Sequence, residues 1–201
     1  ETDPIAEPLA ESLAHPGGNI TGTFLDLPDF AAKLLELLIE STGKLSRIAV
    51  MWDPATGPVQ PQSVKKAAAA FKLQMEILEV WVAADFEPAF AGARQRGAEA
   101  VVMLSSPLIV PNAKALVELS LHHRLPTITL FPKIARAGGL IGYGPNRVGM
   151  YRQAGVLAGK AMRGLDVASL PIERPTKFEL VVNQRTAEAL GLSIPASVIL
   201  R

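Results

Sequence analysis

Polar and aromatic side chains follow several short apolar runs of this sequence, at points where a strand would give way to a loop. Their hydroxyl and amide groups can hydrogen-bond a small organic molecule, and the aromatic rings can stack on its apolar part. This inventory favours reversible binding of an amino acid, an aromatic acid or another small carboxylate. The candidate ligand-binding residues are Asp53, Thr56, Ser105, Ser106, Phe131, Tyr143 and Asn146.

An amino-acid ligand would also need an acidic partner for its ammonium group. Among the loops that carry the candidates, only Asp53 offers a carboxylate. An aspartate directly before a proline, as at Asp53-Pro54, is also a common strand-ending turn. Both interpretations of Asp53, ligand contact and turn former, are therefore kept.

The sequence offers no set of residues for catalysis, metal binding or a cofactor. The chain has no cysteine, and no serine stands in the G-x-S-x-G pattern of a nucleophile elbow. His122 and His123 are adjacent near the end of a predicted helix, so their side chains point to different faces. Gly142, Gly144 and Gly149 fit neither the dinucleotide fingerprint nor the Walker pattern. We expect no catalytic residue, no metal site, no cofactor and no enzymatic activity.

Strand and helix patterns alternate along the chain and would position these candidates. Strands of apolar and β-branched residues are predicted at 47–52, 75–80, 100–104, 125–129 and, very short, 140–141. Helical spacing of apolar residues predicts helices near 29–40, 64–71, 85–97, 112–123 and 147–164, the last closing the lobe. Such alternation implies right-handed crossovers. The predicted fold class is α/β, a doubly wound parallel sheet of flavodoxin-like order with helices on both faces.

Open parallel sheets bind ligands outside the carboxyl ends of their strands. The loops at those ends cover residues 53–60, 105–107, 131–133 and 143–147. We expect these loops to converge at one mouth.

The segments before and after the alternating strands and helices divide the chain into three predicted parts. Residues 1–24 are interpreted as the remnant of a first lobe with a hinge strand, and 25–170 as the ligand-binding α/β lobe. Residues 171–201, which begin within a connector punctuated by Pro171 and Pro175, are interpreted as a hinge strand and a C-terminal return segment.

Charge and hydropathy exclude several partners. The chain has 20 Lys+Arg and 19 Asp+Glu, a formal charge of +1, and no long run of like charges, so we expect no nucleic-acid partner. Its apolar stretches fall well short of the roughly 20 residues that span a bilayer. The acidic start ETDPIAEPLAE lacks the basic flank and apolar run of a signal peptide, so any signal would already have been removed.

Ordered motifs along the chain carry a resemblance to a known family. They are Asp3-Pro4 with residues 12–22 (SLAHPGGNITG), Trp52-Asp53-Pro54, Tyr143-Gly144-Pro145-Asn146, and residues 175–183 (PTKFELVVN). Together they resemble the ABC-transporter substrate-binding family that includes tryptophan- and tyrosine-binding members. The similarity covers nearly the whole chain, and the ordered set is far more specific than any one motif.

The resemblance implies a two-lobed type 1 periplasmic binding protein, of which this chain would lack most of the first lobe. It implies that a small solute binds between the lobes and is delivered to ABC permease subunits. It also implies a periplasmic location, or lipid anchoring outside the cytoplasmic membrane. A hinge surface left exposed could pair two copies as a homodimer.

Two other classes of protein share this fold. A ligand-sensing effector domain of a lac-repressor-type regulator would need a helix-turn-helix and a basic patch ahead of Glu1, and the chain shows neither. An α/β enzyme should present a carboxylate pair or a cysteine at the strand ends. Only Asp53 stands there, so the enzyme is the weaker alternative.

Overall fold

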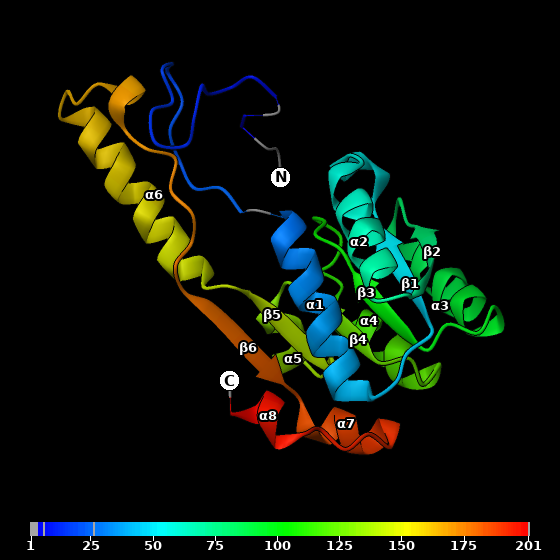
Figure 1. Cartoon of the computed structure of the whole chain (residues 1–201). Coiled ribbons are helices and arrows are strands. Elements are labelled where there is room, and N and C mark those ends of the chain that lie inside the picture. Colours follow the sequence, from blue (N-terminus) through cyan, green and yellow to red (C-terminus); the bar gives the residue numbers. More distant parts are fainter. Residues whose placement is uncertain (1–3, 6, 26, 201) are drawn as a thin grey trace. The chain divides into compact units, whose positions relative to one another are not determined.

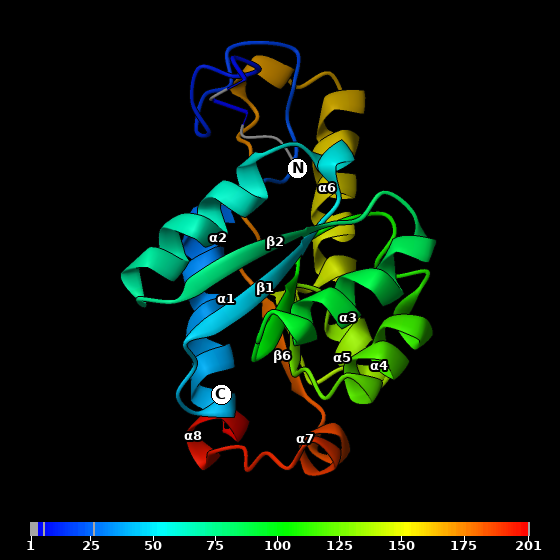
Figure 2. The ribbon, with the colours of Figure 1, turned by 90° about the vertical axis from the view of Figure 1, so that its right-hand side faces the viewer.

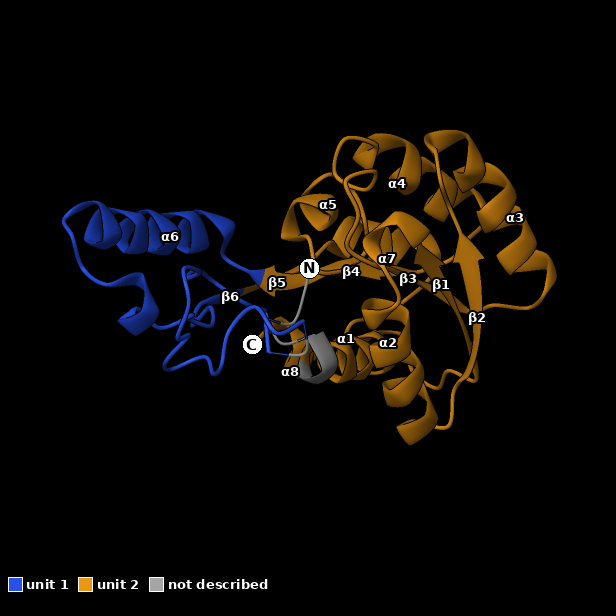
Figure 3. Cartoon of the chain, turned by 90° about the horizontal axis from the view of Figure 1, so that it is seen from above, with its two compact units in different colours: residues 1–26, 145–178 blue, residues 27–144, 179–201 orange. Residues whose placement is uncertain are grey.

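The computed structural model describes residues 4–5, 7–25 and 27–200, leaving out the side chains of 27–29; Asp3 of the first motif lies outside this part. The chain forms two compact units (Figure 3). The smaller unit comprises Glu1–Asp26 and Pro145–Phe178, and the larger unit comprises Leu27–Gly144 and Glu179–Arg201. These bounds differ from the predicted ranges 1–24, 25–170 and 171–201. The assignment of those ranges to a first-lobe remnant, a ligand-binding lobe and a return segment stays a prediction.

A six-stranded sheet of order β2-β1-β3-β4-β5-β6 organises the larger unit (Figure 1). Neighbouring strands from β2 to β5 pair in parallel. The order of the first five strands is the predicted flavodoxin-like one. The strands are β1 (Arg47–Trp52), β2 (Gln74–Glu79), β3 (Ala100–Met103), β4 (Thr127–Thr129), β5 (Ile141–Pro145) and β6 (Phe178–Val182).

The last strand, β6, runs against the other strands. The Asn183 N–H donates to the Leu140 carbonyl, and the Asn146 N–H donates to the Lys177 carbonyl, both at 2.9 Å. Residue numbers therefore fall along β6 as they rise along β5, which is the antiparallel arrangement. The chain leaves the larger unit at the end of β5 and re-enters through β6, so this strand must run back.

Helices cover both faces of the sheet, as the alternating pattern predicts. Figures 2 and 3 show α1 and α2 on one face and α3 and α4 on the other. Helix α8 contacts α1, and α7 contacts α4. The helices of the larger unit are α1 (Leu27–Thr42), α2 (Val59–Ala70), α3 (Phe86–Gln95), α4 (Ala113–His122), α5 (Pro132–Arg136), α7 (Gln184–Leu190) and α8 (Ala196–Ile199). Single 3-10 turns, η1 (Pro54–Thr56) and η2 (Ala83–Asp85), precede α2 and α3.

The central strands are buried on both faces. Every residue of β3 is buried, and so are the four inner residues of β1. On the α3 and α4 face, Phe86 and Phe90 are 1% and 0% exposed and fill the core against these strands. Continuous apolar runs are what a parallel strand covered on both sides requires. The core therefore holds the carboxyl ends of β1 and β3 in fixed positions.

Helix α6 (Arg147–Met162), which we expected to close the sheet lobe, belongs to the smaller unit. There the chain near the N-terminus runs beside the segment after α6 and the 3-10 turn η3 (Val167–Ser169), because Glu173 exchanges backbone hydrogen bonds with Gly22 and Phe24. The Gln153 side chain of α6 donates to the Glu173 carboxylate. These contacts hold α6 with the smaller unit.

Candidate functional site

The loop after β1 is a rigid turn built on Asp53. Its carboxylate accepts the Ala55 N–H at 3.0 Å and the Ser106 hydroxyl at 2.6 Å, so both oxygens are engaged. The Trp52 indole N–H donates to the Gly57 carbonyl at 3.0 Å and closes the same loop. Asp53 is only 6% exposed. Its observed role is therefore to form the turn and to tie it to the loop after β3.

Gln60, which the sequence analysis did not single out, joins the same two loops. Its side-chain amide donates to the Ser105 carbonyl at 2.9 Å, and its carbonyl oxygen accepts the Ser105 N–H at 2.8 Å. Thr56 accepts a third contact from Gln60 at 3.3 Å and donates to the Asp53 carbonyl at 2.7 Å. A signal existed, because Gln60 precedes Val64 by four residues and thus shares its inward helix face.

The neighbouring serines have different surroundings. Ser106 is buried, donates to Asp53 and accepts the Leu108 N–H at 3.0 Å. Ser105 is half-buried, and within the described part of the chain its hydroxyl takes no part in these hydrogen bonds. Ser105 is therefore the hydroxyl of this group that is available to a ligand. We call Asp53, Thr56, Gln60, Ser105 and Ser106 the edge network.

The two candidate aromatic residues pack within the larger unit. Phe131 stands at the start of α5 and packs on the core cluster of the α3 and α4 face. The Tyr143 ring stacks on Phe30 of α1, with a centroid distance of 5.3 Å and an interplanar angle of 9°. Phe30 was not among the candidates, and no local pattern pairs it with a residue so distant in sequence. Both candidate rings are half-buried, and their contact with a ligand stays a prediction.

Close backbone packing explains the glycines around Tyr143. A Cβ atom on Gly144 would lie 1.8 Å from the Leu130 carbonyl oxygen, and one on Gly142 would lie 2.6 Å from the Pro132 Cα. Only residues without a side chain allow β5 to approach the loop after β4 this closely. The glycines therefore bring Leu130 and Phe131 against β5.

Asn146 belongs to the smaller unit, whereas the other candidates belong to the larger unit. Its side chain accepts the Gly149 N–H at 2.7 Å and thereby caps α6. A separate cavity of about 290 Å³ adjoins it, lined by residues that include Arg152 and Lys177. Of the four loops predicted to converge, those after β1 and β3 are joined directly by hydrogen bonds. Asn146 belongs to the smaller unit, so its convergence with them stays a prediction.

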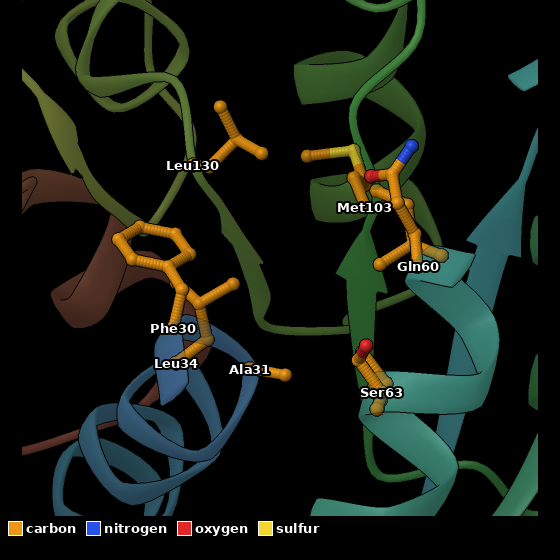
Figure 4. A pocket seen from close by; sticks show the side chains of 9 residues that line it. Phe30, Ala31, Leu34, Gln60, Ser63, Met103 and Leu130 are labelled. Carbon is orange, nitrogen blue, oxygen red and sulfur yellow. The ribbon is translucent and has the colours of Figure 1, made fainter. Parts of the chain in front are cut away.

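An apolar crevice opens beside the edge network in the larger unit (Figure 4). Side chains from α1, from the first turns of α2 and from the ends of β3 and β4 face one another there. The cavity volume is about 20 Å³, so the crevice is narrow. Its wall includes Phe30, Leu34, Gln60, Met103, Leu104 and Leu130.

A family model for ABC transporter substrate binding proteins matches residues 1–201. The chain belongs to this family. The match confirms the resemblance carried by the ordered motifs, and it places the edge network and the apolar crevice within a substrate-binding protein of the α/β class.

Relatives of this substrate-binding family member are longer than the chain. A tyrosine-binding protein of Clostridioides difficile (strain R20291) is 26% identical over 196 residues, which are 95% of this chain and 55% of that protein. The chain thus spans about half the length of this curated relative.

Solved structures share its fold. A conserved domain protein from Vibrio cholerae has a TM-score of 0.87 at 22% identity, covering 100% of this chain and 67% of that one. An ABC domain from Streptococcus pneumonia in complex with L-Trp has a TM-score of 0.86 at 22% identity, covering 99% of this chain and 69% of that one. These likenesses confirm the predicted fold class.

Within the described residues, no group of three or more His, Cys, Asp or Glu side chains is arranged to hold a metal ion. Of the helices described, none is both long and apolar enough to cross a membrane.

Proposed function

We propose that this member of the substrate-binding family is part of the solute receptor of an ABC import system. The observation that carries the proposal is the family match over residues 1–201. The solute is a small organic molecule, in the class of amino acids, aromatic acids or other small carboxylates. ABC permease subunits are the protein partners, and the site of action is the periplasm or the outer surface of the cytoplasmic membrane.

In this proposal, the larger unit supplies one side of the ligand-binding site. The edge network holds the loops after β1 and β3 in one geometry before a ligand arrives, which lowers the entropic cost of binding. Ser105 has a hydroxyl available to bond the solute. Phe131, Tyr143 and Asn146 are further proposed contacts, and Asp53, Thr56 and Ser106 act by holding the loops.

Binding without chemical conversion is the activity we propose. The mechanism is a shift of population from an open to a closed arrangement of lobes when the solute binds. No covalent step is required. Incubation with a bound solute should therefore return it unchanged, as followed by one-dimensional NMR, whereas any turnover would revive the enzyme alternative.

A thermal-shift panel tests the receptor. The protein at its natural length is screened against amino acids, aromatic acids, small carboxylates and sugars. A specific ligand at 100 times its Kd should stabilise the fold by about 2.7 kcal/mol. A rise confined to one chemical class supports the receptor, and a flat response to the whole panel contradicts it.

We also propose a homodimer as the self-association state. Exposed apolar side chains of α6 support it, with Tyr151 67% and Met162 88% exposed. Light scattering at micromolar concentration should give twice the mass of one chain, and a Met162→Lys substitution should reduce it. A monomeric mass at the highest soluble concentration would rule the dimer out.

A further inference from the structure

We infer that the cavity of the smaller unit is a second ligand site, which binds a small organic anion carrying a phosphate or carboxylate group. The cavity volume is about 290 Å³, and its walls come from the start of α6 and from the segment that leads into β6. A volume of this order accommodates a small organic molecule. The inference does not depend on which solute the larger unit binds.

Two cationic side chains from separate segments line the cavity. Arg152 lies on α6, and Lys177 immediately precedes β6. Within the described part of the chain, neither side chain takes part in an ion pair or a hydrogen bond. A guanidinium group can bind two oxygens of a carboxylate or phosphate at once, and an ammonium group adds a second charge. The cavity therefore offers two unpaired positive charges to an anion.

Helix α6 adds positive charge at the same place. Arg147 is its first residue and Arg152 and Lys160 follow, whereas the helix contains no Asp or Glu. The N-terminus is the positive end of a helix, so acidic residues are favourable there and cations are not. The Asn146 side chain caps the helix by accepting the Gly149 N–H, but an amide brings no negative charge. A bound anion would offset the positive charge at the start of α6.

The carboxylate that contacts α6 lies outside the cavity wall. Glu173 is half-buried, accepts a hydrogen bond from the Gln153 amide, and does not line the cavity. Of the described residues that do line it, none is acidic. The cavity wall therefore carries no negative charge that would repel an anion.

Apolar side chains indicate that the anion is organic. Met150, Val156 and Pro175 supply hydrocarbon surface to the cavity. An inorganic ion would leave this surface in contact with water, whereas the carbon skeleton of an organic anion would cover part of it. The expected ligand thus combines an oxyanion group with a short carbon skeleton.

The two walls are already joined at the backbone. The Asn146 N–H donates to the Lys177 carbonyl at 2.9 Å. These residues lie beside the points where the chain passes between the units, because the second segment of the smaller unit comprises Pro145–Phe178. An anion bound to Arg152 and Lys177 would add another link between the same two segments.

Methionine methyl NMR tests the site. Met150 lines the cavity, Met162 ends α6 and is 88% exposed, and Met103 belongs to the larger unit. The protein at its natural length, labelled with ¹³C at the methionine methyls, is titrated at constant ionic strength with glycerol 3-phosphate, with succinate and with uncharged glycerol. The Met150 signal should shift to saturation with one or both anions and stay in place with glycerol. The Met103 and Met162 signals should not move.

A phosphate group can come from a soluble molecule or from a lipid head group. Sedimentation with phosphatidylglycerol vesicles, compared with phosphatidylcholine vesicles, distinguishes these sources. Pelleting that Arg152→Gln abolishes supports the anion site and identifies a lipid as its ligand. Protein that binds glycerol 3-phosphate and ignores both vesicles supports the same site with a soluble ligand.

Matched variants test the two charges. Arg152→Gln and Lys177→Gln each remove one lining charge and should weaken anion binding by about tenfold or more. Arg163→Gln removes a charge from the exposed C-cap of α6, which does not line the cavity, and should leave affinity within about twofold. Val156→Glu places a carboxylate on the wall, at a side chain that is 52% exposed, and should abolish the Met150 shift.

Several results would overturn the inference. They are a Met150 signal that neither anion shifts, an equal shift with glycerol, and unchanged affinity in folded Arg152→Gln and Lys177→Gln proteins. Any solute that the thermal-shift panel identifies is then added to protein saturated with the anion. Simultaneous binding supports a separate site, whereas competition at Met150 would assign the cavity to the solute site and contradict it.

Discussion

Helices α1 and α6 have the same length, 16 residues, and very different surroundings. Helix α1 buries Leu34, Leu35, Leu37 and Leu38, each at most 3% exposed. In α6, by contrast, Leu157 is the one buried residue among those described, and apolar side chains such as Met162 face solvent. Apolar residues at helical spacing thus indicate that a helix face can be buried. Whether it is buried depends on the elements that pack against it.

The largest difference between the two helices should appear when a leucine of α1 is truncated. Leu35 is 0% exposed, so Leu35→Ala should lower the free energy of unfolding of the larger unit by about 2–5 kcal/mol, through lost burial and a cavity. Val156→Ala in α6, where the side chain is 52% exposed, is the control and should cost less than about 0.5 kcal/mol. Urea unfolding followed by circular dichroism measures both. Equal losses would mean that α6 is buried in solution.

The next effect should come from the tight approach of β5 to the loop after β4. In Gly144→Ala the new Cβ would lie 1.8 Å from the Leu130 carbonyl oxygen, so backbone must move. We expect a loss of about 3 kcal/mol in the free energy of unfolding, at the upper end of overpacking changes. The shift in urea midpoint at constant slope measures it. A neutral result would show that the loop can yield.

A smaller loss should follow from opening the edge network. Ser106→Ala removes the donor at 2.6 Å from Asp53 and leaves a carboxylate oxygen buried without that partner. The expected cost is about 2 kcal/mol in the free energy of unfolding. Ser105→Ala is the matched control and should leave stability nearly unchanged while weakening solute binding, as measured by calorimetry. Equal stability of the two variants would contradict the assigned roles.

The smallest effect has the opposite sign and lies in α6. A Cβ on Gly159 would meet no atom within 4 Å, and the backbone there is helical. Gly159→Ala should raise the free energy of unfolding of the smaller unit by about 0.5–1 kcal/mol, because alanine loses less backbone entropy in a helix. Thermal unfolding measures it. A loss instead of a gain would show that something covers this face.

Much of the larger unit was predictable, whereas most of its site was not. The β1 bounds match the predicted 47–52, because a β-branched run ending in Asp-Pro is a local signal. Asp53 and Ser106 were both expected at the sheet edge, but their direct bond was not, because it joins residues far apart in sequence. Phe30 was missed for the same reason, whereas Gln60 had a local signal in the inward helix face that it shares with Val64. The prediction that α6 closes the sheet lobe was wrong, because the spacing of its apolar residues indicates a face that can be buried and does not indicate which element covers it.

The motifs that carry the family resemblance acquire physical roles only in the folded chain. Trp52 and Asp53 close the turn after β1, Gly144 admits the neighbouring loop, and Asn146 caps α6. Asn183 caps α7 by accepting the Thr186 N–H, and it donates to the Ala135 carbonyl at 3.0 Å. A short motif thus specifies a local backbone geometry, whereas some of the residues that it contacts lie elsewhere in the chain.

Local sequence patterns were enough to predict the α/β class, a flavodoxin-like order for the first five strands, and the edge of the sheet at which loops carry polar groups. Those features follow from local periodicity and from the handedness of the chain, which act within a few residues. The folded chain was needed to show which polar groups hydrogen-bond one another, which ones are left for a ligand, and which helix faces are covered. These outcomes depend on distances between residues that meet only when the sheet has formed.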